Sequence, residues 1–185
     1  MIKRIGLGLL LAATALLAGC GATPATESGR NVLPTDITPV HYDIIVRPDA
    51  AALTFTGSVS ADVQVVRATN TVTLNAADMT FGKIRLDGVD AAPTVTFDDK
   101  AQTATLTFAG PLAVGKRRLA IDYTGKINQQ AFGLFSVDYA TDQGEKRLLA
   151  TQFESPDARR FAPMWDEPAL KATFKLTLST AEGSI

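Results

Sequence analysis

The sequence predicts an all-β fold in which many short antiparallel strands form a β-sandwich. Apolar and polar residues alternate with a period of two in much of the chain, a pattern typical of strands with one buried face. Gly, Pro and Asp residues interrupt this alternation at short intervals, as turns between strands do. No segment after the first twenty residues shows a helical apolar stripe with capping residues. These three observations favour a sandwich over a helical or α/β fold.

Residues 1–19 are predicted to be a lipoprotein signal peptide rather than part of the fold. Lys3 and Arg4 precede an apolar run at residues 5–17, which is shorter than the roughly 20 residues that cross a bilayer as a helix. The run ends in Leu-Ala-Gly-Cys, which resembles the bacterial lipobox, so we expect cleavage before Cys20 and lipidation of its thiol. The alternative is an ordinary signal peptide followed by a chance cysteine.

The residues that follow Cys20 predict the location of the mature chain. Gly21 stands where lipoproteins retained in the inner membrane typically have Asp. We therefore expect attachment to the bacterial cell envelope through the lipid anchor, in the outer membrane and facing the periplasm. Residues 20–31 are small, polar and non-periodic, which is typical of a flexible tether, and residues 32–185 form the predicted β domain.

The first half of the β domain contains one long predicted strand and several shorter ones. In residues 53–65 nearly every odd position is apolar and every even position is polar. The apolar residues of the shorter strands are, in chain order, Tyr42, Ile44 and Val46, then Val72 and Leu74, then Ile84 and Leu86. Thr and Val dominate these segments, as expected for half-buried strands.

The second half of the domain predicts a hairpin, a break and two further strands. Val95 and Phe97 lead through Asp98-Asp99-Lys100 to Ala104, Leu106 and Phe108, which indicates a hairpin. Gly110-Pro111 and Val114-Gly115 are predicted to break the chain. The apolar residues of the last two strands are Leu119, Ile121 and Tyr123, then Phe174, Leu176 and Leu178.

Composition excludes two classes of function for this chain. Its 185 residues include 18 Lys and Arg against 19 Asp and Glu, without a basic block, so we expect no nucleic-acid partner. It has one His and one Cys, His41 and Cys20. A catalytic zinc site usually needs at least two His ligands, so we expect this chain to hold no zinc by itself.

The region of residues 155–170 departs from the strand pattern. It is dense in charge and proline, so we expect irregular structure with at most a short helical turn near residues 157–160. The charged residues surround Trp165 and are Asp157, Arg159, Arg160, Asp166 and Glu167. We expect them to be structural and to hold the loop in place. A glycosidase carboxylate pair is disfavoured because the adjacent Asp166 and Glu167 would point apart on an extended chain.

Gln152 and Glu154 are the candidate binding residues. A strand that leaves the core at Phe153 would place both side chains on one face, where an amide and a carboxylate could bind a cationic amine. From spacing alone, an ion pair of Glu154 with Arg159 or Arg160 is the favoured alternative.

The segment TQFESPDARRFAPMWDEPALKATF resembles the signature of the N-terminal domain of the aminopeptidase N family, which are zinc-dependent gluzincin exopeptidases. Two upstream segments also resemble the family pattern, namely Leu33-Pro34 with His41-Tyr42-Asp43, and residues 125–136. The likeness runs from about residue 32 to about residue 180. Three departures, Ser155-Pro156, Ala162 and Met164, alter packing and leave the polar residues of the signature unchanged.

The resemblance implies a saddle-shaped β-sandwich packed against a catalytic domain of the same polypeptide, with peptides that have a free N-terminus as substrates. It implies that Glu154 binds the α-amino group of the substrate and that Gln152 lines the first side-chain pocket. The zinc, the catalytic segments and their ligands belong to the parent protein, so we expect this chain to be a fragment, incomplete at its C-terminus and inactive alone. A non-enzymatic surface lipoprotein that binds a partner is the alternative function.

Overall fold

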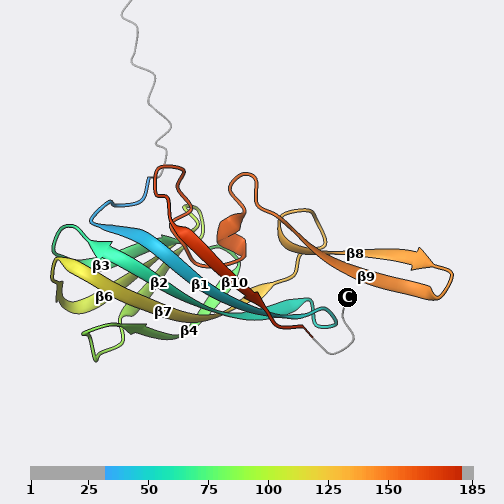
Figure 1. Ribbon diagram of the computed structural model, residues 1–185, viewed down its shortest axis with the longest axis horizontal. Coiled ribbons are helices and arrows are strands. Elements are labelled where there is room, and N and C mark those ends of the chain that lie inside the picture. Colours follow the sequence, from blue (N-terminus) through green and yellow to red (C-terminus); the bar gives the residue numbers. More distant parts are fainter. Residues whose placement is uncertain (1–31, 181–185) are drawn as a thin grey trace, which may run out of the picture. The chain divides into compact units, whose positions relative to one another are not determined.

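The computed structural model describes residues 32–180, which form ten strands and one short 3-10 helix (Figure 1). The predictions for residues 1–31, including the signal peptide and Cys20, lie outside these described residues. In chain order the elements are β1 (Ile37–Asp49), β2 (Thr54–Val65), β3 (Thr69–Asn75), β4 (Met79–Leu86), β5 (Thr94–Asp98), β6 (Thr103–Leu112), β7 (Gly115–Lys126), β8 (Gly133–Thr141), β9 (Gly144–Gln152), η1 (Ala158–Arg160) and β10 (Thr173–Leu178). The predicted all-β class is therefore confirmed.

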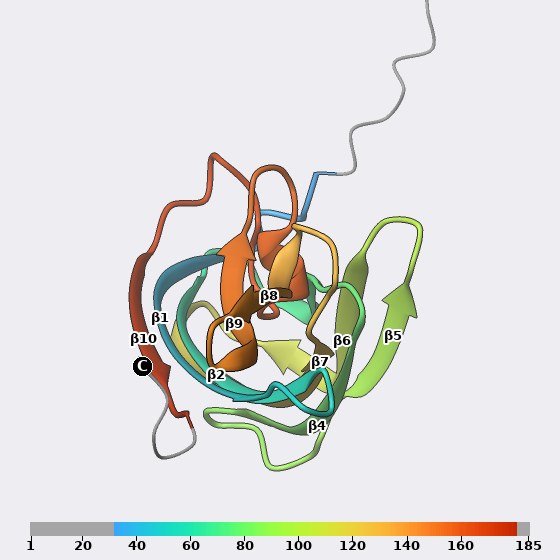
Figure 2. The same cartoon turned by 90° about the vertical axis from the view of Figure 1, so that its right-hand side faces the viewer.

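The strands form three sheets (Figure 2). A five-stranded sheet has the order β10-β1-β2-β7-β4, a three-stranded sheet has the order β3-β6-β5, and β8 pairs with β9 as a hairpin. All pairs are antiparallel except β1 with β10, which is parallel. The sequence pattern did not predict this parallel pair. Residues 153–172 connect β9 to β10, so the last strand returns beside the first and runs in the same direction.

The core lies between the five-stranded and three-stranded sheets and confirms the predicted alternation. On β2 the inward side chains are each less than 4% exposed: Phe55, Val59, Ala61, Val63 and Val65. The facing sheet contributes Val72, Leu74, Leu106 and Phe108, all of them buried. Removal of these apolar surfaces from water is the main favourable term in the folding of the domain.

One predicted break is wrong. Gly110-Pro111 lies inside β6, and the chain turns only at residues 113–114. The pairing of β6 with β3 explains why the proline is tolerated. Thr71 is opposite Thr107 whereas Thr69 is opposite Leu112, so an irregularity already separates the two parts of the ladder. Proline is accepted at such bulges because no ladder hydrogen bond needs its missing N–H.

Gly57 is the one inward position of β2 without an apolar side chain, because the ring of Tyr123 occupies that space. It pairs with Tyr123 of β7, and a Cβ at position 57 would clash with the tyrosine ring. The ring therefore lies across the glycine, in edge-to-face contact with Phe55 at 6.1 Å between centroids. Burial raises the pKa of Tyr123 well above its ordinary value.

Strand β10 presents an apolar face to solvent. Phe174, Leu176 and Leu178 are 57–58% exposed, and they pair with the buried Tyr42, Ile44 and Val46 of β1. The ring of Phe174 stacks on that of Tyr42, with centroids 4.8 Å apart. In residues 32–180 no helix is long and apolar enough to cross a membrane.

Candidate functional site

The two candidate binding residues lie at the end of β9. Gln152 is the last residue of the strand and pairs with Gly133 of β8, and both Gln152 and Glu154 are exposed. The predicted strand does not continue through Phe153, because the Phe153 carbonyl accepts a hydrogen bond from the Asp157 N–H at 2.9 Å and begins a turn. The Gln152 side chain folds back over this turn, and its Oε1 accepts the Glu154 N–H at 3.1 Å.

The carboxylate of Glu154 forms no ion pair with any Lys, Arg or His of residues 32–180. The ion pair favoured by spacing alone is not formed, because both arginines have other partners. Arg159 Nε donates to Asp166 Oδ2 at 2.9 Å, and Arg160 Nε donates to Asp157 Oδ1 at 2.9 Å. An exposed carboxylate is therefore left at the end of β9.

Contacts between aromatic rings connect this turn to the core. The Phe153 ring lies 5.2 Å from that of Phe161, which in turn lies 6.1 Å from the core residue Phe55. The Arg160 guanidinium lies 5.1 Å from the centroid of the Phe132 ring and also pairs with Asp78. The turn that carries Glu154 is thus fixed to the core and is not a loose connection.

The irregular segment after η1 enters the core between the sheets. Its residues Phe161, Ala162, Met164 and Trp165 are buried. Met164 exchanges two backbone hydrogen bonds with Asn75, at 2.8 and 3.1 Å. The side-chain Oδ1 of Asn75 accepts the Asp166 N–H at 3.0 Å. These contacts satisfy backbone groups that cannot join a regular ladder.

Tyr42 holds the same segment from β1. Its hydroxyl oxygen accepts the Trp165 N–H at 3.0 Å in a buried position. Burial raises the pKa of Tyr42 well above its ordinary value; the Trp165 N–H opposes this shift and the nearby Asp166 charge adds to it. The hydroxyl is therefore neutral at physiological pH.

The structure places the remaining predicted loop residue, Glu167, against the start of the domain. Its Oε1 accepts the N–H of Leu33 at 3.3 Å. Sequence reasoning missed three residues that hold the loop: Tyr42, Asn75 and Asp78. Asn75 carries a weak signal, since it is a polar residue that directly follows the alternation of Val72 and Leu74 and is 1% exposed. Asp78 has a left-handed backbone with φ of 54°, which Asp tolerates better than most residues.

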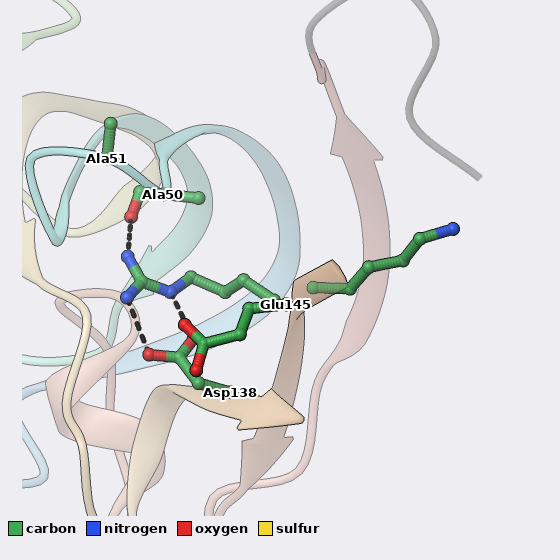
Figure 3. A pocket seen from close by; sticks show the side chains of 6 residues that line it. Ala50, Ala51, Asp138 and Glu145 are labelled. Carbon is green, nitrogen blue, oxygen red and sulfur yellow. Dashed lines mark hydrogen bonds and ion pairs between the residues drawn. The ribbon is translucent and has the colours of Figure 1, made fainter. Parts of the chain in front are cut away.

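The β8–β9 hairpin, which was not predicted, extends away from the sandwich (Figure 1). Arg147 attaches one face of it to the turn between β1 and β2 through its contacts with Asp138 and Ala50, both of which are labelled in Figure 3. Its guanidinium donates to both carboxylate oxygens of Asp138, at 2.6 and 2.7 Å, and to the Ala50 carbonyl at 2.5 Å. The hydrogen bond from Arg147 lowers the pKa of Asp138. The pocket at this point is lined by Ala50, Ala51, Asp138, Glu145, Lys146 and Arg147.

Comparison with known proteins decides the family. The pattern of the Peptidase M1 N-terminal domain matches residues 38–185. The chain belongs to the M1 peptidase family. Relatives include aminopeptidase N of Acetobacter pasteurianus, 40% identical over 186 residues, which cover 95% of this chain and 52% of the relative. Aminopeptidase M1-D of Oryza sativa subsp. japonica is 40% identical over 85% of this chain and 18% of its own length. The alanine/arginine aminopeptidase of Saccharomyces cerevisiae is 41% identical over 80% of this chain and 18% of its own length.

These relatives confirm the resemblance drawn from the motif at residues 151–174. The chain spans about half the length of the Acetobacter relative and less than a fifth of the rice and yeast proteins. The fold described above is therefore that of an M1 N-terminal domain, and about half of the Acetobacter relative and most of the rice and yeast proteins lie outside the matched region.

The residues of this M1 domain do not fit a zinc ion. Among residues 32–180, no three His, Cys, Asp or Glu side chains are grouped closely enough to share a metal. His41 Nδ1 is 2.6 Å from Thr173 Oγ1, and His41 Nε2 is 3.6 Å from Asp43 on the outer surface of the sheet. We therefore assign no metal ligand among residues 32–180.

Proposed function

We propose that this domain serves a zinc-dependent aminopeptidase by binding the α-ammonium group of a peptide substrate through Glu154. The observation that carries the proposal is the exposed Glu154 carboxylate at the end of β9, inside the family signature and without an ion pair among residues 32–180. The named activities of the relatives, which are aminopeptidases, support the substrate class.

The chemistry of this carboxylate favours a peptide terminus over an internal peptide bond. An ammonium group brings a positive charge and N–H donors to an acceptor that carries the opposite charge. An internal peptide nitrogen brings neither the charge nor the additional donors. Gln152 lies near Glu154 in the sequence, and its side chain would line the pocket for the first side chain of the peptide. Its Oε1 accepts the Glu154 N–H, which leaves Nε2 and one lone pair of Oε1 for hydrogen bonds with the substrate. Bond cleavage and the zinc would then belong to the catalytic domain of the same polypeptide.

Glu154→Gln in the full-length polypeptide tests the proposal. We expect kcat/KM for alanyl-p-nitroanilide to fall by roughly 30- to 150-fold, or about 2–3 kcal/mol, because the charge partner of the amine is lost while the side-chain shape is kept. Inhibition by alaninamide and by propanamide, which lacks only the amine, gives the second readout. Alaninamide should inhibit the parent enzyme more strongly than propanamide does, and this difference should largely disappear in the variant.

Glu145→Gln is the matched control, because Glu145 is an exposed carboxylate at the other end of β9. It should leave both readouts unchanged. Equal turnover by the Glu154→Gln variant and the parent would contradict the amine role and favour a different function for this surface. Unfolding of the variant at a lower temperature than the control would instead assign Glu154 a structural role.

We also propose that the chain is exported to the bacterial cell envelope and anchored by a lipid on Cys20. The lipobox-like segment before Cys20 supports this proposal. Cys20→Ser should abolish incorporation of labelled palmitate. Ala22→Ser, a substitution in the adjacent tether, is the control and should be labelled like the parent. Palmitate incorporation by Cys20→Ser equal to that of the parent would contradict the lipid anchor.

A further inference from the structure

Exposed valines gather at the end of the sandwich where β1 begins, which we name the entry end. Val66 and Val114 lie directly beyond the last rung of the β2–β7 ladder. The Val66 N–H donates to the Asp36 carbonyl at 2.8 Å, so the residues before β1 lie beside them. The exposed valines of this end are 46–62% exposed and are Val32, Val40, Val66 and Val114. Figure 1 shows the entry end on the left, opposite the β8–β9 hairpin.

A pocket at the entry end carries more positive than negative charge. Its lining consists of Val40, Asp62, Val63, Asp87, Lys116, Arg117 and Arg118. Arg118 is paired with Asp62 at 3.4 Å. Among residues 32–180, Lys116 and Arg117 form no ion pair with a carboxylate, and neither does Asp87 with a cation. Two unpaired cations therefore face one unpaired carboxylate.

Arg117 is held in place without using all of its hydrogen-bond donors. Its Nη1 donates to the Asp87 carbonyl at 3.1 Å and lies 2.6 Å from where a Gly88 Cβ would stand, so only glycine leaves room for it. Its Nε is buried without a hydrogen-bond partner among residues 32–180. Its Nη2 has no partner among the same residues, so two N–H groups are available for charge-assisted hydrogen bonds to a phosphate oxygen.

The chain enters the domain at this same end. Cys20, the proposed lipidation site, lies twelve residues before Val32, the first described residue. A chain of that length spans at most roughly 40 Å when fully extended. A lipid on Cys20 would therefore hold the entry end near a bilayer, where weak contacts act at a high effective concentration. Apolar side chains beside cations are the combination that binds an anionic bilayer surface.

We propose that the entry end binds the surface of an anionic phospholipid bilayer. A headgroup phosphate binds at Lys116 and Arg117, and the two turn valines enter the headgroup region. The choice of occupant rests on the lipid anchor proposed above, whereas the pocket and the valines do not depend on it. Since β7 leads into β8 at the other end of the sandwich, this contact leaves Glu154 on the side away from the bilayer.

Vesicle sedimentation tests this contact separately from the anchor. The full-length polypeptide is produced without residues 1–19 and with Cys20→Ser, so that no lipid on the chain contributes. It is mixed at millimolar lipid with vesicles of phosphatidylcholine alone or with phosphatidylglycerol in equal parts. We expect the partition coefficient to be at least about tenfold higher for the anionic vesicles, because two cations face them. Equal binding to both vesicles, or binding to neither, would overturn the proposal.

Two variants at the entry end are compared with a matched control. We expect Lys116→Gln to lower partition into the anionic vesicles roughly fivefold. Val114→Asp should lower it at least as much, because it removes an apolar side chain and adds a repelled charge. Lys100→Gln is the control, since Lys100 is an exposed lysine in the β5–β6 turn at the other end of the sandwich. It should bind like the parent, and all three variants should unfold at the temperature of the parent.

Equal losses in Lys100→Gln and Lys116→Gln would overturn the proposal, because the attraction would then come from the charge of the whole protein. Binding that excess inorganic phosphate abolishes but Val114→Asp leaves unchanged would also overturn it, in favour of a site for free phosphate. Palmitate incorporation at Cys20 is measured on the exported protein. A failure of the anchor therefore remains distinguishable from a failure of the bilayer contact.

Discussion

Replacement of Trp165 by Ala is expected to lower the free energy of unfolding of this domain by about 3–5 kcal/mol. Trp165 is 4% exposed, although it belongs to an irregular segment, and its backbone N–H donates to the buried Tyr42 hydroxyl. Removal of the indole leaves a cavity where the segment passes between the sheets. Since domains are typically stable by only 5–15 kcal/mol, we expect a large fraction of the variant to unfold under mild conditions.

Urea unfolding followed by far-UV circular dichroism measures this loss, because Trp165 is the only tryptophan and its fluorescence disappears with it. Phe174→Ala is the control, since that aromatic ring is 57% exposed on β10. It should cost less than about 1.5 kcal/mol. A Trp165→Ala variant as stable as this control would mean that the segment packs at the surface in solution.

Most of the fold could be predicted from sequence because strand burial is a local pattern. The alternation of β2 and β7 appears directly in residues 53–65 and in Leu119, Ile121 and Tyr123, all three of which are buried. The β5–β6 hairpin was predicted from two alternating runs around Asp98-Asp99-Lys100, and the structure forms it with Val95 opposite Leu106. The pleat of a strand determines which side chains share a face, so no distant partner is needed for these predictions.

The features that were missed depend on distant partners or weak alternation. The parallel pairing of β10 with β1 depends on how residues 153–172 cross the molecule, which no local pattern specifies. In β8 the apolar Val137 and Tyr139 alternate with polar residues, but β9 begins with a run of three charged residues at 145–147, so the second strand of this hairpin alternates weakly. Gly110-Pro111 was judged a break, although the irregular ladder around it accepts both residues.

The candidate site was also predicted only in part. Residue spacing indicated Gln152, Glu154 and the charged residues that follow as candidates. It could not determine which carboxylate each arginine would contact. Arg160 reaches Asp78, 82 residues earlier in the chain, and the Asp166 N–H reaches Asn75, 91 residues earlier. Arg160 is occupied by the distant Asp78 and the nearby Asp157, and Arg159 by Asp166, whose backbone is held by Asn75. Glu154 is therefore left without either arginine, and the ion pair that spacing alone favoured does not form.

Arg159→Met is expected to cost about 2–4 kcal/mol, because it removes the cation from a largely buried pair and leaves the Asp166 charge behind. The two side chains are 12% and 23% exposed, and Arg159 contacts both the carboxylate and the backbone carbonyl of Asp166. Urea unfolding of the single variants and of Arg159→Met with Asp166→Asn forms a double-mutant cycle. The double variant should lose at least 1 kcal/mol less than the sum of the single losses, roughly a fivefold difference in the folding equilibrium.

Arg147→Met provides the contrast, since its pair with Asp138 is more exposed and surface ion pairs contribute little to stability. Additive losses at Arg159 and Asp166 would show that the pair is not coupled and that the loop is held by Trp165 and Asn75 alone. While Asp166 holds Arg159, this arginine is not available to Glu154, five residues earlier. The pair that stabilises the loop therefore also leaves the Glu154 carboxylate without this arginine, as the proposed binding of an amine requires.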